Sequence, residues 1–148
     1  MVILGIDPGL AIVGYGVLEY EKSRFRVLDF GAIRTPAGMR TEDRLCKIHR
    51  GMNELIDRYR PSEMAVEELF FVKNITTGIS VAEARGVILL AAREKGLNIG
   101  EYTPMQVKQA VVGYGMAEKK QVIAMVRSFL HLGEELKLDD TADALAIA

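Results

Sequence analysis

Four acidic residues stand at the ends of expected secondary-structure elements: Asp7, Glu67, Asp140 and Asp143. Asp140 and Asp143 are three residues apart, so on a helix they share one face, as ligands of a common cation must. Like charges ~4 Å apart repel by about 4 kcal/mol at an effective dielectric of 20, and a bound cation would offset that cost. Hard divalent ions such as Mg²⁺ take oxygen ligands and bridge carboxylates to a substrate phosphate. The pattern therefore indicates a metal site.

Each of these carboxylates also has a structural explanation. A turn alone would explain Asp7, which begins an Asp-Pro-Gly sequence, and helix capping would explain Asp139 or Asp140. Glu67 is harder to explain in this way, because it ends an apolar strand, where a glutamate is seldom buried without a partner. The spacing of the acidic residues alone does not decide between a metal site and these structural roles. It also does not exclude the adjacent Glu68 and Asp139.

Five short segments are predicted strands. Residues 2–6, 12–19 and 25–33 are separated by turn-length gaps, which predicts an antiparallel meander. Residues 64–67 and 97–102 follow helical stretches and are too brief to be helices themselves. Asp7 and Glu67 would therefore each stand at the end of a strand.

Apolar residues recur at helical spacing in the remainder of the chain. The predicted helices cover residues 41–60, 80–95, 104–112 and 117–130, and a terminal helix opens at 139–141, whereas residues 74–78 are expected to form a loop. Helical crossovers between the later strands favour a mixed five-stranded sheet, three strands antiparallel and the others parallel, with helices on both faces. No internal repeat or long linker divides the chain, so residues 1–148 are expected to form one domain.

The amino-acid composition indicates less about function than the acidic residues do. The 19 basic and 20 acidic side chains nearly cancel, so net charge argues neither for nor against a nucleic-acid partner. The single cysteine, Cys46, lies in an apolar helical pattern and is expected in the core, which suits the reducing cytoplasm. The apolar N-terminal run meets Asp7 too soon for a signal peptide or a membrane span. His49 and His131 lack a ligand pattern and are interpreted as structural or surface residues.

Several segments together resemble the RuvC family of Holliday-junction resolvases. They are, in the order of the family's motifs, residues 5–9 (GIDPG), 14–17, 65–70 (AVEELF), 73–74, 84–87, 106–109, 117–122 and 140–146 (DTADALA). The resemblance spans the whole chain. The order of the motifs is highly specific, although Asp-Pro-Gly alone is a weak signal.

The resemblance implies a ribonuclease H-like endonuclease of DNA recombination and repair. It would act as a homodimer on four-way junction DNA, nick two strands of like polarity, and work beside a branch-migration motor. Two Mg²⁺ ions per active site, with Mn²⁺ as a substitute, would be held by the family's catalytic carboxylates, which match Asp7, Glu67, Asp140 and Asp143. Lys108 and Lys119 match positions near the DNA backbone, and Phe70 matches an aromatic residue placed against bases.

Other interpretations remain. A lysine on a helix is by default a solvated residue, and Phe70 beside Phe71 would otherwise be a core side chain. A ribonuclease H or RNA-processing nuclease could share the fold, but the order of the motifs disfavours it. A phosphate-binding lobe of actin-like proteins or sugar kinases is disfavoured because no Ser or Thr follows Gly9. The presence of all four carboxylates disfavours an inactive junction-binding module. Members of the RuvC family generally continue past the helix that carries Asp143, so this helix is expected to be short.

Overall fold

The computed structural model describes residues 1–69, 75–136 and 140–148. Its centre is a five-stranded sheet in the order β3-β2-β1-β4-β5. The strands are β1 (Val2–Asp7), β2 (Ile12–Glu21), β3 (Arg24–Arg34), β4 (Glu63–Glu67) and β5 (Asn98–Tyr102). The first three are antiparallel neighbours, whereas β4 lies parallel to both β1 and β5. The predicted mixed sheet is therefore confirmed.

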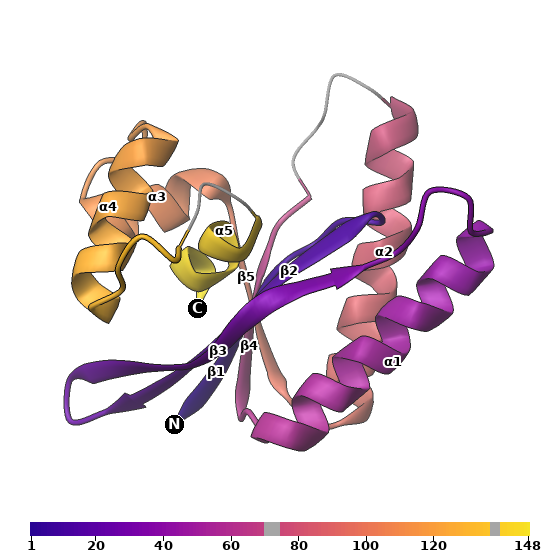
Figure 1. Cartoon of the computed structure of the whole chain (residues 1–148), viewed down its shortest axis with the longest axis horizontal. Helices are drawn as coiled ribbons and strands as arrows, with labels where there is room; N and C mark the ends of the chain where they lie inside the picture. Colours follow the sequence, from indigo (N-terminus) through magenta and orange to yellow (C-terminus); the bar gives the residue numbers. More distant parts are fainter. Residues whose placement is uncertain (70–74, 137–139) are drawn as a thin grey trace.

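Helices cover both faces of this sheet, as predicted (Figure 1). They are α1 (Thr41–Tyr59), α2 (Ile75–Glu94), α3 (Pro104–Val112), α4 (Lys119–Leu130) and α5 (Asp140–Ile147). In the view of Figure 1, α1 and α2 lie to the right of the strands, and α3, α4 and α5 lie to the left. Two hydrophobic clusters correspond to these two layers.

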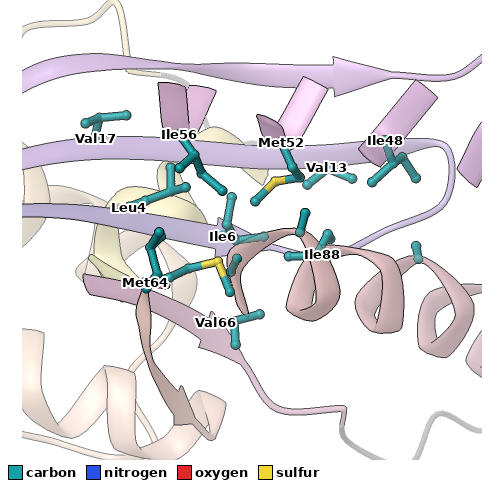
Figure 2. Close-up of a cluster of buried hydrophobic side chains, with 14 residues drawn as sticks. Leu4, Ile6, Val13, Val17, Ile48, Met52, Ile56, Met64, Val66 and Ile88 are labelled. Atoms are coloured by element: carbon teal, nitrogen blue, oxygen red, sulfur yellow. The ribbon is translucent and has the colours of Figure 1, made fainter. Parts of the chain in front are cut away.

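The larger cluster lies under α1 and α2 (Figure 2). Leu4 and Ile6 of β1 alternate with residues of the opposite face, as the period of two in a strand requires. Ile48 and Met52 of α1, one helical turn apart, are fully buried against them. Burying a side chain of this size contributes about 1.5–3 kcal/mol, so this layer holds the strands in place.

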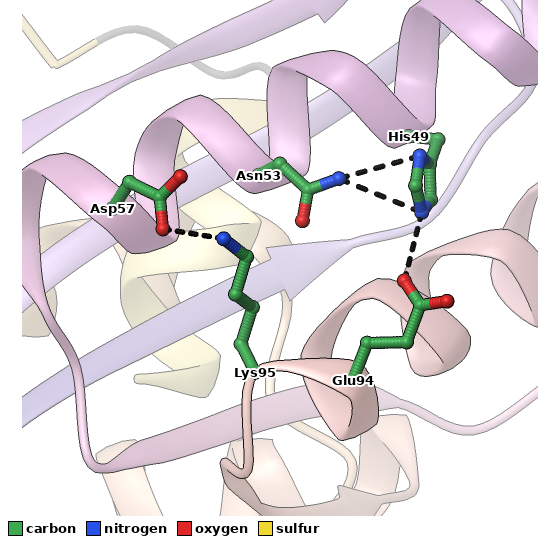
Figure 3. Close-up of polar contacts among 5 residues, drawn as sticks. All are labelled: His49, Asn53, Asp57, Glu94 and Lys95. Atoms are coloured by element: carbon green, nitrogen blue, oxygen red, sulfur yellow. Dashed lines mark hydrogen bonds and ion pairs between the residues drawn. The ribbon is translucent and has the colours of Figure 1, made fainter.

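Polar contacts tie the outer sides of α1 and α2 together (Figure 3). Lys95 Nζ lies 2.6 Å from Asp57 Oδ1, and His49 Nε2 lies 3.1 Å from Glu94 Oε2. The amide of Asn53 also contacts the His49 ring, at 3.3 Å. Exposed pairs of this kind contribute about 0–1 kcal/mol each. They join α1 to the C-terminal end of α2 and to Lys95 just after it, and they contribute little to the stability of the fold.

Two expectations from the sequence were wrong. Residues 75–78 belong to α2 and not to a loop; inside this helix the Ser80 hydroxyl donates to the carbonyl of Thr76, so its polar residues bond within the helix instead of turning the chain. Cys46 is exposed and not in the core. The buried stripe of α1 runs through Ile48 and Met52, and a helical rotation of about 100° per residue turns Cys46 away from it.

Helix α2 is long and apolar. By length and hydropathy alone it could cross a membrane. However, Ala84, Ile88, Ala91 and Ala92 are fully buried in the larger cluster. This face of α2 packs on α1 and the sheet as a core helix does.

Candidate active site

The site begins where two parallel strands end. Asp7 is the last residue of β1, and Glu67 is the last residue of β4. The two strands are paired neighbours, with Ile6 opposite Val66. Because the carboxyl ends of parallel strands meet at the same edge of a sheet, both acidic side chains are delivered to one place.

Glycines in the sheet allow α5 to approach this place. A Cβ atom at Gly14 would overlap the carbonyl oxygen of Asp140, and one at Gly5 would overlap the carbonyl oxygen of Ala144. At Gly16 it would lie 2.6 Å from Leu145 Cδ2. Gly5 and Gly16 are opposite each other in the β1–β2 pair, and Gly14 is opposite Asp7. The three form a glycine floor on which the backbone of α5 lies directly.

This close approach brings three carboxylates together. Oxygen atoms of Asp7, Asp140 and Asp143 all lie within 4.8 Å of one another, and all three side chains are half-buried. Glu67 lies next to this group, close enough for its charge to raise the pKa of Asp7 and for the charge of Asp143 to raise the pKa of Glu67. A set of oxygen donors without nitrogen or sulfur suits a hard divalent cation such as Mg²⁺ or Mn²⁺.

The carboxylates perturb one another strongly. Burial, followed by the charges of Glu67, Asp143 and Asp140, raises the pKa of Asp7 to about 8. Burial and the charge of Asp143 also raise the pKa of Glu67, against the opposing effects of Asp7, Lys119 and Lys108. A protonated carboxyl is a poor metal ligand, whereas a bound cation would favour the ionised form of both groups. The negative charge of the cluster is thus not neutralised by the neighbouring side chains, which fits a metal centre.

Two lysines supply part of that charge. Lys119, at the start of α4, donates to Asp143 Oδ2 at 2.7 Å. Burial lowers the pKa of Lys119, but the hydrogen bond to Asp143 and the nearby carboxylates raise it above its usual value. Lys108 and Lys119 line a cleft of about 190 Å³ together with Glu67 and Asp143. The structure therefore places both predicted lysines beside the carboxylates.

The sequence matches one family model along almost its whole length. This model, described as crossover junction endodeoxyribonuclease RuvC, covers residues 3–148. The chain belongs to this family. It is 57% identical to the RuvC of Halothermothrix orenii and 54% identical to that of Clostridioides difficile, over 100% of this chain and 90% and 88% of those proteins.

A solved structure agrees with this assignment. The chain is similar to Thermus thermophilus RuvC in complex with a Holliday junction substrate, with a TM-score of 0.95 and 40% identity over 100% of this chain and 90% of the other. The ribonuclease H-like resolvase fold predicted from the motifs is thereby confirmed. As a RuvC-family protein, the chain is a nuclease that acts as a hydrolase on junction DNA.

The structure also distinguishes between neighbouring acidic residues. Glu68 is exposed, and its backbone N–H donates to the carbonyl of Tyr102 at 2.9 Å. Successive strand residues face opposite sides of a sheet, so β4 turns Glu67 and not Glu68 toward Asp7. Asp139 and Phe70 lie outside the described residues. The proposed contact of Phe70 with bases therefore stays a prediction.

Arg85 is a functional candidate that residue-level reasoning missed. From α2, its Nε donates to the backbone carbonyl of Glu67 at 3.1 Å, and its guanidinium also pairs with Glu101. The arginine thus holds the end of β4, from which the Glu67 side chain projects. Its position within the 84–87 RuvC motif was the available signal.

Proposed function

We propose that this RuvC-family chain resolves four-way DNA junctions by paired, symmetric nicks, using two Mg²⁺ ions per active site. The observation that carries the proposal is the convergence of Asp7, Asp140 and Asp143 within 4.8 Å at the end of β1. Glu67 is the fourth ligand in this proposal, because its charge acts on Asp7 and the charge of Asp143 acts on it. Mn²⁺, which takes the same oxygen donors, would substitute.

The bound ions would supply an activated water and neutralise the charge on the leaving oxygen of the phosphodiester. The protein's own groups prepare this chemistry. Asp7 must release its proton to become a ligand, and Lys119 fixes the orientation of Asp143 through their 2.7 Å hydrogen bond. Lys108 lines the same cleft and is proposed to contact a DNA phosphate. Phe70, which matches an aromatic residue of the family, is proposed to stack on bases near the junction centre.

A homodimer is the second part of the proposal, because two strands must be cut symmetrically. The outer face of α2 carries exposed apolar side chains, with Ile75 78%, Ile79 56% and Leu90 54% exposed. Ala82 and Gly86 are exposed on the same face, whereas Ala84 is buried inside the chain. Exposed apolar surface of this kind marks interfaces, and a twofold contact is the commonest one. Light scattering that shows only monomer, together with undiminished paired nicking, would contradict the dimer.

The domain organisation, cellular location and protein partner are also part of the proposal. We propose that residues 1–148 work as a single nuclease domain in the cytoplasm, beside a branch-migration motor that presents the junction. These proposals rest on the family's chemistry and on its DNA substrate.

The decisive experiment compares two DNA substrates with and without metal. A synthetic four-way junction and a linear duplex of the same sequence are incubated with the protein in Mg²⁺, Mn²⁺ or EDTA. We expect paired nicks in the junction alone, with either metal and not in EDTA. Junction binding without nicking would indicate an inactive binding module, and cleavage of an RNA–DNA hybrid instead would indicate a ribonuclease H-like activity.

A further inference from the structure

A rigid hairpin joins α3 to α4 beside the candidate active site. Gly113 ends α3 in the left-handed region, with φ 81°, and its N–H donates to the carbonyl of Gln109 at 2.9 Å. The N–H of Ala117 closes the next turn on the carbonyl of Tyr114 at 3.1 Å, and Ala117 itself is buried in the smaller core. Gln121 Oε1 then accepts from the N–H of Glu118 at 2.8 Å. Each turn of the hairpin is therefore closed by a hydrogen bond of its own.

The tip of this hairpin displays apolar side chains to solvent. Tyr114 is 58% exposed, Met116 is 68% exposed, and Met105 of α3 is 59% exposed. Gly115, which lies between Tyr114 and Met116 in the sequence, packs closely on Met105, since a Cβ atom at Gly115 would lie 2.8 Å from Met105 Cγ. Because more than half of each side chain is exposed, these residues bury little apolar surface within the chain and contribute little to its own stability. A rigid apolar tip is instead suited to contacting a partner, because little conformational freedom is lost on binding.

The surroundings of the tip point to DNA as that partner. Lys119 and Lys120 follow the tip directly, and Lys108 lies one turn beyond Met105 on α3. Lys108 and Lys119 line the same cleft as Glu67 and Asp143. A DNA strand whose phosphate reaches the carboxylates therefore passes next to the hairpin. Basic side chains contact phosphates, and apolar side chains such as methionine insert from the minor groove between base steps.

We propose that Met105, Tyr114 and Met116 form an apolar DNA-contacting tip that sets the register of the cleaved strand over the carboxylates. The tip lies against the minor groove of the duplex arm that carries the scissile phosphate, while Lys108 and Lys120 contact phosphates beside it. The tip is a positioning element and takes no part in the chemistry. This inference rests on the proposed junction-cleaving function.

The test uses the double variant Tyr114→Ser with Met116→Ser in the full chain. On an immobile four-way junction in Mg²⁺, we expect the single-turnover nicking rate to fall about tenfold, the scale of one lost base or sugar contact. The nicks should also spread over neighbouring phosphates, while the thermal midpoint stays that of the wild type. Tyr114→Phe with Met116→Leu should restore both the rate and the position of the nick.

Phe129→Ser is the matched control, because Phe129 is 52% exposed near the far end of α4. This variant should nick at the wild-type position and rate. An unchanged rate and nick position in the Ser double variant would overturn the role of the tip, as would equal loss in the Phe/Leu variant. Absence of junction nicking by the wild-type protein would reject the proposed function and the tip together, whereas wild-type nicking that survives the Ser substitutions would reject the tip alone.

Discussion

Strand β1 presents Leu4 and Ile6 to α1 and α2 on one face of the sheet, and Gly5 and Asp7 to α5 on the other. The first face is filled by large side chains that hold the helices at ordinary packing distance (Figure 2). The second face carries glycines where α5 packs, so the backbone of α5 lies directly on the strands and its carboxylates reach Asp7. The face under α1 and α2 stabilises the fold through side-chain packing. The face under α5 has less side-chain packing and carries the charged site.

The sharpest test of this division is to neutralise the carboxylates. We expect Asp7→Asn and Glu67→Gln each to lower junction cleavage by about a thousandfold, because several kcal/mol of metal-based charge stabilisation is lost. Junction binding should persist. Stability in EDTA should be equal or higher, since mutual repulsion is relieved. Cleavage assays and chemical unfolding measure the two effects.

Glu68→Gln is the internal control for these variants, because Glu68 is exposed beside Glu67. It should remain active. An inactive Glu68→Gln beside an active Glu67→Gln would show that the wrong glutamate was chosen. Loss of folding in Asp7→Asn would instead return Asp7 to the role of a turn residue.

Next in size is the expected effect of a single methyl group in the glycine floor. Gly14→Ala places a Cβ atom against the Asp140 carbonyl and must displace α5. Misplacing a catalytic group by about 1 Å can cost about a hundredfold in rate, whereas overpacking costs about 1–3 kcal/mol of stability. Single-turnover nicking should therefore fall about a hundredfold in a variant that loses no more than about 1–3 kcal/mol of unfolding free energy. Gly38→Ala, which would meet nothing within 4 Å, should change neither quantity.

On the face of the sheet under α1 and α2, a substitution should lower stability and leave the cleavage rate unchanged. Met52→Ala empties a fully buried site between α1 and the sheet, and should cost about 2–5 kcal/mol of unfolding free energy. At a temperature where the variant remains folded, its junction-cleavage rate should match that of the wild type. Met52→Leu should lose less than about 1.5 kcal/mol. A large loss of activity in folded Met52→Ala would mean that the two faces are not independent.

The pH dependence of stability offers a finer comparison. Asp7 has a pKa of about 8 in the fold, against 3.8 for a free carboxyl, so between these values the folded protein binds a proton that the unfolded chain has released. The stability from this group is full below about pH 4 and is lost as pH rises to about 8. Urea unfolding in EDTA should show this decline. Asp7→Asn should make the decline shallower and leave the part due to Glu67, whose pKa is also raised. A decline as steep as that of the wild type would assign the effect elsewhere.

The smallest expected effect concerns the lysines at the rim of the site. Lys108→Ala should weaken binding to all junction sequences about equally and reduce the slope of log affinity against log salt by about one unit. Lys119→Ala should do the same and should also slow cleavage, because Lys119 holds Asp143. Titrations at several salt concentrations measure the slope. An unchanged slope with an altered cut-site preference would indicate base contacts instead.

Much of the architecture followed from local patterns. Alternation in the strands and the spacing of Ile48, Met52 and Ile56 in α1 reflect the periods of two and 3.6 that burial on one face imposes. Where an element starts was less predictable, as α2 shows, because Thr76 and Gly78 are also typical of turns. Cys46 shows the same limit, since an apolar neighbourhood in sequence does not give the angle of a residue around its helix.

The sequence by itself determined that four carboxylates would stand at the ends of elements and that glycines would recur in β1 and β2. Only the tertiary structure decided that Asp7, Asp140 and Asp143 meet within 4.8 Å, and that Glu67 rather than Glu68 turns toward them. The reason is that side-chain periodicity fixes directions only within one element. The distance between β1 and α5 depends on what separates them, and the three glycines of the floor leave no side chain between them.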